Sequence, residues 1–458
     1  MRFKIYRIFC ATLIAITTSA AFGQSYEWRL ALFQGQGFHS VAFNPLSDGR
    51  TIFAGPSGTG GIFRSDDGGL TWTMHDSGTA DFPMLNVHQV ICLPSDTSVV
   101  LAVTPTKLYR STDGGISWSD TSNLGGVNGE SICYHAADDA IYYGQNFGYA
   151  TWKSTDHGAT WTKMNILQGN ATLCSLGCSV DIPPVLLAGS HDSARIDRST
   201  DEGLTWVNIP DTSFSEEVPK IVFSDYATNG YHNHGIAIAT RWYSSFSRSL
   251  IATADGGLTW PALASPSPRV WALDIDQRAA MISRPSDPAY PLPLHFWTGL
   301  FNVRADTIPN GLVQETNDGG LTWHSTNFPI GHSTDSNHPN VRQIWVLKYD
   351  TLSGKLAVAT DSGVFITDTR LGVPHVESLP SGESIRIEHN GNQLRIDALD
   401  QTIASIEIYD MLGRAVFRMA RAFAESDAIS TSSFPVGVYL LKIDHIGSVP
   451  TVKLLTLR

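Results

Sequence analysis

Basic residues are in short supply in this chain of 458 residues. Lysine and arginine together number 31 against 43 aspartates and glutamates, which gives a formal net charge of −12 at pH 7. Nucleic acids and anionic membrane surfaces attract basic proteins, so we expect neither as a partner. Past residue 23 the sequence also lacks an apolar run long enough to span a bilayer, and we expect no transmembrane segment in the mature chain.

Cysteine is scarce as well, with five residues, of which Cys10 lies in an expected signal peptide. Cys174 and Cys178 are four residues apart in one expected strand, which is too far for a direct disulfide at about 3.3 Å per residue. For these two and for Cys92 and Cys133, buried thiols and disulfides otherwise both stay open. No second CxxC or histidine partner completes a zinc site, and we expect neither a metal nor a cofactor.

The first 23 residues have the features of a secretory signal peptide. Basic residues between positions 2 and 7 precede an apolar run over 8–16, and small residues follow. We place cleavage after Gly23, with cleavage after Ala21 as the alternative. The protein is therefore expected to be exported.

One eight-residue pattern, [ST]-x-D-x-G-x-[ST]-W, occurs six times. Successive copies begin 43 to 63 residues apart, about the length of one four-stranded propeller blade. The Asp can accept N–H bonds in a tight turn, the Gly tolerates positive φ, and the Trp leads into the next strand. We expect a structural role for Asp67, Trp72, Asp113, Trp118, Asp156, Trp161, Asp201, Trp206, Asp255, Trp260, Asp318 and Trp323.

Each copy follows three β-rich runs, of which the first is expected to line a central channel. A seventh set of runs, at 343–367, is not followed by a Trp box. Its missing outer strand has to come from elsewhere, and the run 26–32 stands unpaired near the N-terminus. We predict an all-β fold in which residues 24–372 form a seven-bladed β-propeller closed by the N-terminal strand.

The fifth and sixth repeats are longer than the others, and we expect their extra residues to form loops on one face. The proline-rich stretch 283–293 is not expected to form regular secondary structure. Trp242, Tyr243 and Trp297 are candidates for ligand contact because they lie in these insertions. Trp271 and Trp345, at matched positions on inner strands, are expected to pack between sheets.

The repeated pattern resembles the Asp-box, or BNR, repeat of sialidases, sortilin-type receptors, xyloglucan-active glycoside hydrolases and photosystem II assembly factors of the Ycf48 type. The resemblance implies that each box is a structural turn on the blade periphery. Any active site would then lie elsewhere on the propeller.

The C-terminal part of the chain changes character. A polar linker is predicted over 373–383, followed by alternating strands that predict a small immunoglobulin-like β-sandwich over 384–458. Four stretches of this tail, 394–397, 406–414, 434–443 and 452–458, resemble the type A C-terminal sorting domain of type IX secretion substrates. The resemblance implies the type IX machinery as a partner and a secreted or outer-membrane surface location.

For function, we favour a non-catalytic binding module for an extracellular glycan or protein. His39, His88, Arg269 and Arg342 fall at or beside the starts of inner strands, where they could ring one mouth of the channel. A third option, an assembly factor of the Ycf48 kind, would be favoured by a basic patch built from Lys220 with the two arginines.

The alternative is a glycoside hydrolase, either sialidase-like or xyloglucanase-like. Its weak catalytic candidates are Glu130 and Asp225, and nothing in the sequence pairs two carboxylates across a cleft. The Phe/Tyr-Arg-Ile-Pro motif of sialidases is absent from the sequence.

Overall fold

The computed structural model divides the chain into two compact units, Met1–Thr369 and Arg370–Arg458. Every secondary-structure element of the described residues is a β-strand. The structure describes residues 26–33, 36–76, 84–121, 124, 129–146, 150–166, 172–191, 195–210, 217–224, 237–242, 249–265, 267, 269–277, 281–284, 287–293, 295–301, 311–329, 343–368, 385–390, 393–398, 403–410, 415–419, 426–430, 437–445 and 451–457.

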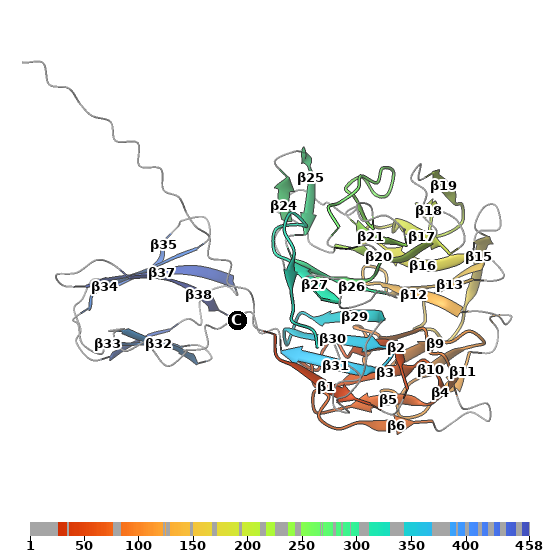
Figure 1. Cartoon of the computed structure of the whole chain (residues 1–458), viewed down its shortest axis with the longest axis horizontal. Coiled ribbons are helices and arrows are strands. Elements are labelled where there is room, and N and C mark those ends of the chain that lie inside the picture. The colour runs from red at the N-terminus through yellow and green to blue at the C-terminus, as the bar shows by residue number, and fades with distance from the viewer. Residues whose placement is uncertain are drawn as a thin grey trace, which may run out of the picture. The chain divides into compact units, whose positions relative to one another are not determined.

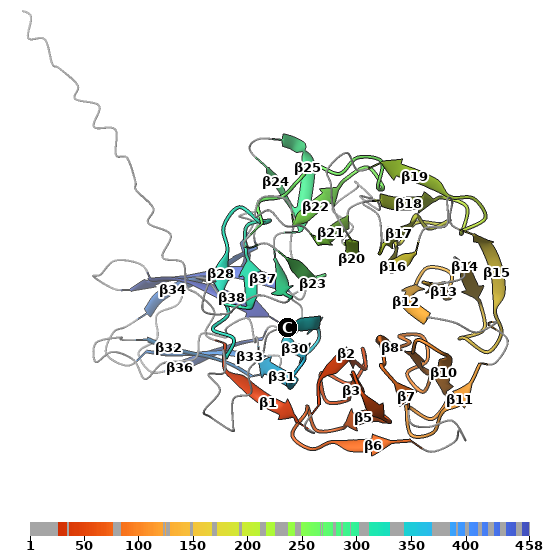
Figure 2. The ribbon, with the colours of Figure 1, turned by 45° about the vertical axis from the view of Figure 1, so that its right-hand side comes forward.

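The first unit is a seven-bladed propeller, as predicted (Figure 1). Figure 2 shows the blades around a central channel, with the first strand of each blade innermost. Blade 1 consists of β2 (Phe38–Phe43), β3 (Ile52–Pro56), β5 (Ile62–Ser65) and β6 (Thr73–His75), and blade 2 of β8 (Gln89–Cys92), β9 (Val100–Val103), β10 (Leu108–Ser111) and β11 (Ser119–Asp120). Blade 3 consists of β12 (Gly129–His135), β13 (Ala140–Gln145), β14 (Ala150–Ser154) and β15 (Thr162–Ile166). Blade 4 consists of β16 (Leu173–Cys178), β17 (Leu186–Ser190), β18 (Arg195–Ser199) and β19 (Val207–Pro210).

Blades 5 to 7 complete the ring, and the last one is closed by the N-terminal strand. In blade 7, Trp28 pairs with Thr367 and Leu30 with Phe365, so the edge of the last sheet is covered as expected. Blade 5 consists of β20 (Glu217–Phe223), β21 (Ala237–Trp242) and β22 (Leu250–Thr253). Blade 6 consists of β23 (Val270–Ile275), β26 (Phe296–Leu300), β27 (Val313–Thr316) and β28 (His324–Ser325). Blade 7 consists of β29 (Ile344–Asp350), β30 (Lys355–Thr360), β31 (Gly363–Asp368) and β1 (Trp28–Leu32).

The proline-rich insertion corrects one expectation. Instead of an irregular loop it contains an antiparallel hairpin of β24 (Met281–Arg284) and β25 (Asp287–Pro293). Proline cannot donate to a ladder, but a two-stranded ribbon has free outer edges where a missing N–H costs nothing. A second short pair, β4 (Thr59–Gly60) with β7 (Met84–Leu85), was also not foreseen.

Each Trp box forms the tight turn expected of it at the end of the third strand of its blade. In the first box, the Asp67 carboxylate accepts the backbone N–H groups of Leu70 and Thr71, both at 2.9 Å. Gly69 adopts a φ of 84°, and its N–H donates to the Ser65 hydroxyl at 2.7 Å. The boxes are therefore satisfied structural turns.

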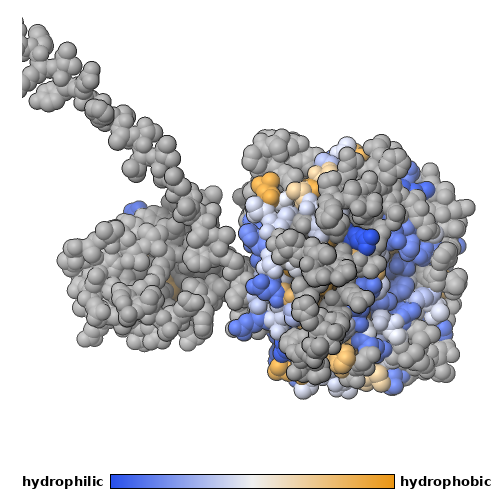
Figure 3. Space-filling model, in the orientation of Figure 1, coloured by the Kyte–Doolittle hydropathy of each residue, from blue (hydrophilic) through white to orange (hydrophobic). Residues whose placement is uncertain are grey.

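The core of the propeller lies between neighbouring blades. Middle strands such as β9 and β17 are buried along their whole length. The visible described surface of this unit is mostly hydrophilic, with small separate apolar areas (Figure 3). The propeller therefore draws its stability from apolar packing between sheets.

The second unit contains two antiparallel sheets, which agrees with the predicted sandwich. One sheet has the order β32 (Ile385–Asn390), β33 (Gln393–Ala398), β36 (Ser426–Ser430), and the other has β35 (Ala415–Met419), β34 (Ile403–Asp410), β37 (Gly437–His445), β38 (Thr451–Leu457). Leu394 and Ile429 of the first sheet and Ile406 and Ile408 of the second are buried. The short polar strand β36 was not foreseen from the sequence.

Candidate ligand-binding site in the central channel

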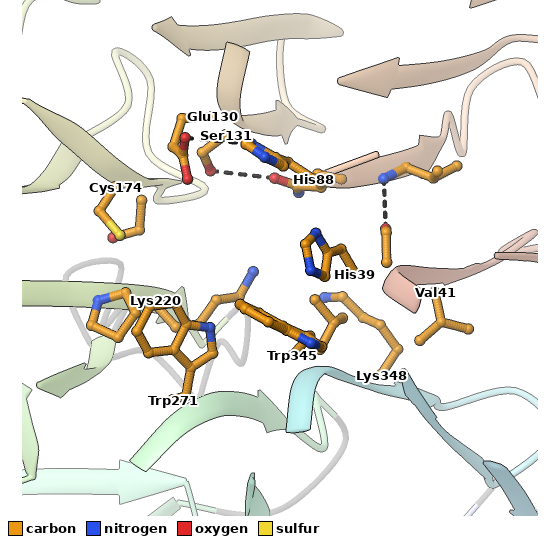
Figure 4. Close-up of a pocket in the computed structure, with 16 residues that line it drawn as sticks. His39, Val41, His88, Glu130, Ser131, Cys174, Lys220, Trp271, Trp345 and Lys348 are labelled. Carbon is orange, nitrogen blue, oxygen red and sulfur yellow. Dashed lines mark hydrogen bonds and ion pairs between the residues drawn. The ribbon is translucent and has the colours of Figure 1, made fainter. Parts of the chain in front are cut away.

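A cavity of about 140 Å³ lies in the central channel, and all seven inner strands or their leading residues contribute to its wall. Figure 4 shows side chains from opposite blades converging on it. The wall consists of His39, Ser40, Val41, His88, Gln89, Val90, Glu130, Ser131, Cys174, Ser175, Pro219, Lys220, Trp271, Trp345, Val346 and Lys348.

β-Bulges bring one side chain from each of five blades to this cavity. The register of the inner strand shifts around His39, Glu130, Cys174, Trp271 and Trp345, where one extra residue stands against the second strand. A bulge leaves its extra residue out of the ladder and re-aims the side chain. The bulges thus place one residue from each of these five blades on the cavity wall.

The residue after the bulge has a structural role in three blades. The Ser40 hydroxyl accepts the N–H of Val90 at 2.8 Å, and the Ser131 hydroxyl accepts that of Leu176 at 3.1 Å. The Ser175 hydroxyl donates to the Val218 carbonyl at 2.6 Å. These bonds join each inner strand to the next blade, so the three serines are engaged in holding the ring together.

Histidines and one carboxylate form one side of the cavity. Nδ1 of His88 lies 3.4 Å from Oε2 of Glu130 and 3.0 Å from the Gly129 carbonyl. Burial alone would lower the pKa of His88, but the hydrogen bond and charge of Glu130 outweigh it, and the pKa is raised. Burial, with a smaller contribution from His88, lowers the pKa of His39 to about 4. His39 is therefore neutral at physiological pH, whereas Glu130 favours the charged form of His88.

Two lysines form the opposite side. Nζ of Lys348 lies 3.4 Å from Oδ1 of Asp274, whose other oxygen accepts the N–H of Tyr349 at 2.8 Å. Burial, and then repulsion by Lys348, lower the pKa of Lys220 to about 8. The cavity therefore contains two ammonium groups, and the charge of Lys348 acts on Lys220.

Aromatic rings complete the wall. The Trp345 ring lies 4.1 Å from the His39 ring and 4.7 Å from the Phe301 ring, measured between centroids. Trp271 stacks on Phe301 at 4.5 Å. Both tryptophans are only partly buried and line the cavity, so the expectation that they merely pack between sheets is corrected.

The structure places none of the ligand candidates from the insertions on the described wall of the cavity. Trp297 lies on the second strand of blade 6, is fully buried, and donates from Nε1 to the Tyr26 hydroxyl at 3.0 Å. Middle strands are sandwiched between neighbouring blades, so its ring has no access to a ligand, and this candidate was wrong. Trp242 ends β21, and its side chain lies outside the described residues, as do Tyr243, Arg342 and Asp225.

Four of the predicted channel residues, His39, His88, Glu130 and Lys220, come together at the cavity, whereas Arg269 is not on its wall. Sequence reasoning missed Lys348. The residue is on an inner strand that was identified, but strict alternation from Trp345 would place it on the opposite face. The bulge between Ile344 and Val346 changes that alternation.

Neither a metal cluster nor a disulfide occurs among the described residues. No group of three or more His, Cys, Asp or Glu side chains within them is arranged to hold a metal ion. Cys92, Cys133, Cys174 and Cys178 are all free thiols, which resolves the alternative left open by the sequence. The described part of the chain also contains no helix long and apolar enough to cross a membrane.

Two family matches agree with the two units. Residues 109–120 match the BNR/Asp-box repeat, and residues 380–456 match the secretion system C-terminal sorting domain. Such a tail, handled by the type IX machinery, directs a protein to the cell surface or the extracellular space.

Curated relatives are distant. A xyloglucanase of Hypocrea jecorina is 25% identical over 286 residues, covering 57% of this chain and 30% of its own length. A xyloglucanase of Paenibacillus sp is 27% identical over 238 residues, covering 42% of this chain and 23% of its own length. The chain thus spans less than a third of the length of these relatives.

Solved structures share the fold. A structure of YCF48 bound to D1 peptide has a TM-score of 0.51 at 16% identity, covering 76% of this chain and 97% of that one. An ancestral GH74 enzyme has a TM-score of 0.51 at 13% identity, covering 94% of this chain and 64% of that one. Together with the family matches, these similarities identify the chain as a seven-bladed Asp-box propeller that carries a secretion-system C-terminal sorting domain.

Proposed function

We propose that the propeller is a non-catalytic binding module for an extracellular glycan or protein, and that the channel cavity is its binding site. The observation that carries the proposal is the composition of the cavity wall. It combines aromatic rings, hydrogen-bonding groups and ammonium groups, and Glu130 is the one carboxylate among its described residues. Pockets with an aromatic wall and a few convergent polar groups are typical binding sites.

The geometry of the cavity wall supports catalysis less well than ligand binding. Glycoside hydrolysis by the common mechanism needs two carboxyl groups facing the scissile bond, about 5–10 Å apart. On the described wall Glu130 has no acidic counterpart, and His88 already engages it. Asp274 is buried and accepts a backbone N–H, so it is occupied as well.

A glycoside hydrolase remains the second candidate because the curated relatives are xyloglucanases. The YCF48 structure, which contains a peptide, supports the protein-ligand form of the first candidate. The two candidates differ in whether Glu130 is essential for turnover.

A glycan and polysaccharide array with the full chain, followed by reducing-end analysis of every hit, tests the proposal. We expect binding without new reducing ends, lost in Trp345→Ala. Trp152→Ala is the matched control because Trp152 is a partly buried tryptophan on β14, away from the cavity wall. Turnover that disappears in Glu130→Gln would instead establish the hydrolase.

A further inference from the structure

Lys220 stands at a position where three other blades carry a serine. By register it occupies the place of Ser40, Ser131 and Ser175, the residues whose hydroxyls join one inner strand to the next blade. In blade 5 that small hydroxyl is replaced by a long cationic side chain. Blades 6 and 7 have the small or apolar residues Ala272 and Val346 at this position, so closure of the ring does not require a cationic side chain there.

The ammonium of Lys220 is also poorly compensated. Among the described residues no hydrogen bond or ion pair to it is found, and Figure 4 shows its side chain reaching toward the middle of the cavity. The nearby Asp274 carboxylate is shared with Lys348 and with the N–H of Tyr349. On the other side, Glu130 is engaged by His88. One positive charge is therefore left over at the cavity.

We infer that the channel cavity binds a carboxylated sugar, such as a hexuronate at the end of an acidic glycan, with its carboxylate against Lys220 and Lys348. This inference rests on the proposed binding function. A carboxylate there would relieve the repulsion between the two ammonium groups and form charge-assisted hydrogen bonds.

The rest of the wall favours a sugar over an acidic peptide. Trp345, partly exposed beside His39, offers an aromatic surface to the apolar face of a ring. Neutral His39 can donate to or accept from a hydroxyl. The small volume of the cavity suits one terminal residue, whereas an extended peptide would need a groove.

The test is calorimetric titration of the full chain with three probes: trigalacturonic acid, its methyl ester, and a pentaglutamate peptide. We expect the acid to bind at least tenfold more tightly than the ester and the peptide. Lys220→Met should weaken binding of the acid at least tenfold, and Lys220→Arg should retain most of it. Lys163→Met is the control, since Lys163 is an exposed lysine of β15 remote from the cavity wall.

Thermal denaturation of each variant shows whether it is folded, and Lys220→Met preserves the apolar stem of the side chain. Equal binding of the acid and the ester would overturn the carboxylate inference and leave the binding function standing. Tighter binding of the peptide would overturn the sugar assignment. If none of the three probes binds, the inference is overturned. If the glycan array is negative as well, the proposed binding function is overturned with it.

Discussion

Trp297 donates its indole N–H to the hydroxyl of Tyr26 at 3.0 Å, which joins the second strand of blade 6 to the segment that closes blade 7. Tyr26 in turn donates to the buried carboxylate of Glu315, and His295 lies 3.5 Å from that carboxylate. A buried polar network therefore holds the N-terminal segment, which closes blade 7, to blade 6. Networks of this kind are costly to break because their members are removed from water.

Tyr26→Phe should lower the free energy of unfolding by about 1–3 kcal/mol, because it deprives Glu315 and Trp297 of a partner inside the core. Urea denaturation of the full chain measures this. Tyr142→Phe is the matched control, since the Tyr142 hydroxyl is buried and has no hydrogen-bond partner among the described residues. A loss as large in the control as in Tyr26→Phe would contradict the role of the network.

The propeller should lose stability in acid through its boxes. Hydrogen bonds from Thr71 hold the pKa of Asp67 well below its usual range, and the pKa of Asp113 is lowered to about 2, where hydrogen bonds from Ser117 outweigh burial. A depressed folded-state pKa contributes stability above the unfolded value, near 3.9, and loses it as pH falls. Thermal melts between pH 7 and pH 2 should show this decline.

Asp255→Asn isolates one box from the rest. At pH 7 we expect a loss of about 1 kcal/mol, because Asp255 accepts the N–H groups of Leu258 and Thr259, both at 3.0 Å. As pH falls through the lowered pKa of Asp255, the wild-type carboxyl is protonated as well, so the difference should shrink. A difference independent of pH would show that the charge of the carboxylate is unimportant.

Gly144 permits close approach of blades 3 and 4. A Cβ at this position would lie 2.6 Å from Cδ1 of Leu173, so Gly144→Ala should destabilise the propeller by about 1–3 kcal/mol. In a Leu173→Ala background the obstructing atoms are gone, and the same glycine substitution should cost much less. Additive losses in the double variant would mean that the penalty arises elsewhere.

Binding of an acidic ligand should weaken as pH rises through about 8. The ammonium of Lys220, with a pKa of about 8, is charged below that value and neutral above it. His88, paired with Glu130, loses charge in the same direction, while His39 is already neutral. The pKa of Lys220 is also affected by the charges of neighbouring groups, which are Lys348, Asp274, Cys133 and Cys174.

Lys220→Arg separates these contributions, because arginine stays charged throughout. Titrations with trigalacturonic acid from pH 6.5 to 9.5 should show a shallower decline in this variant than in the wild type. Identical profiles would assign the pH dependence to His88.

The limits of the sequence are visible in particular residues. The blades, the closing strand and the sorting tail were predicted correctly because each depends on local patterns: a turn motif, a run of β-formers, an ordered set of tail stretches. The sequence predicted an accessible Trp297 and a packed Trp345, whereas Trp297 is buried and Trp345 is partly exposed at the cavity wall. Nothing local distinguishes an indole sandwiched between blades from one at a bulge, since both stand in β-rich runs.

By itself, then, the sequence determined the repeat architecture, the route of export and the structural role of the box turns, because each of these depends on short contiguous motifs. Only the tertiary structure decided which side chains meet in the channel. In a regular strand, alternation predicts on which face of the sheet each side chain lies. The inner strands depart from this alternation at their bulges, which lie around His39, Glu130, Trp271 and Trp345. Lys220 and Lys348 belong to blades 5 and 7 and lie more than a hundred residues apart in the sequence. Closure of the ring brings them to one cavity.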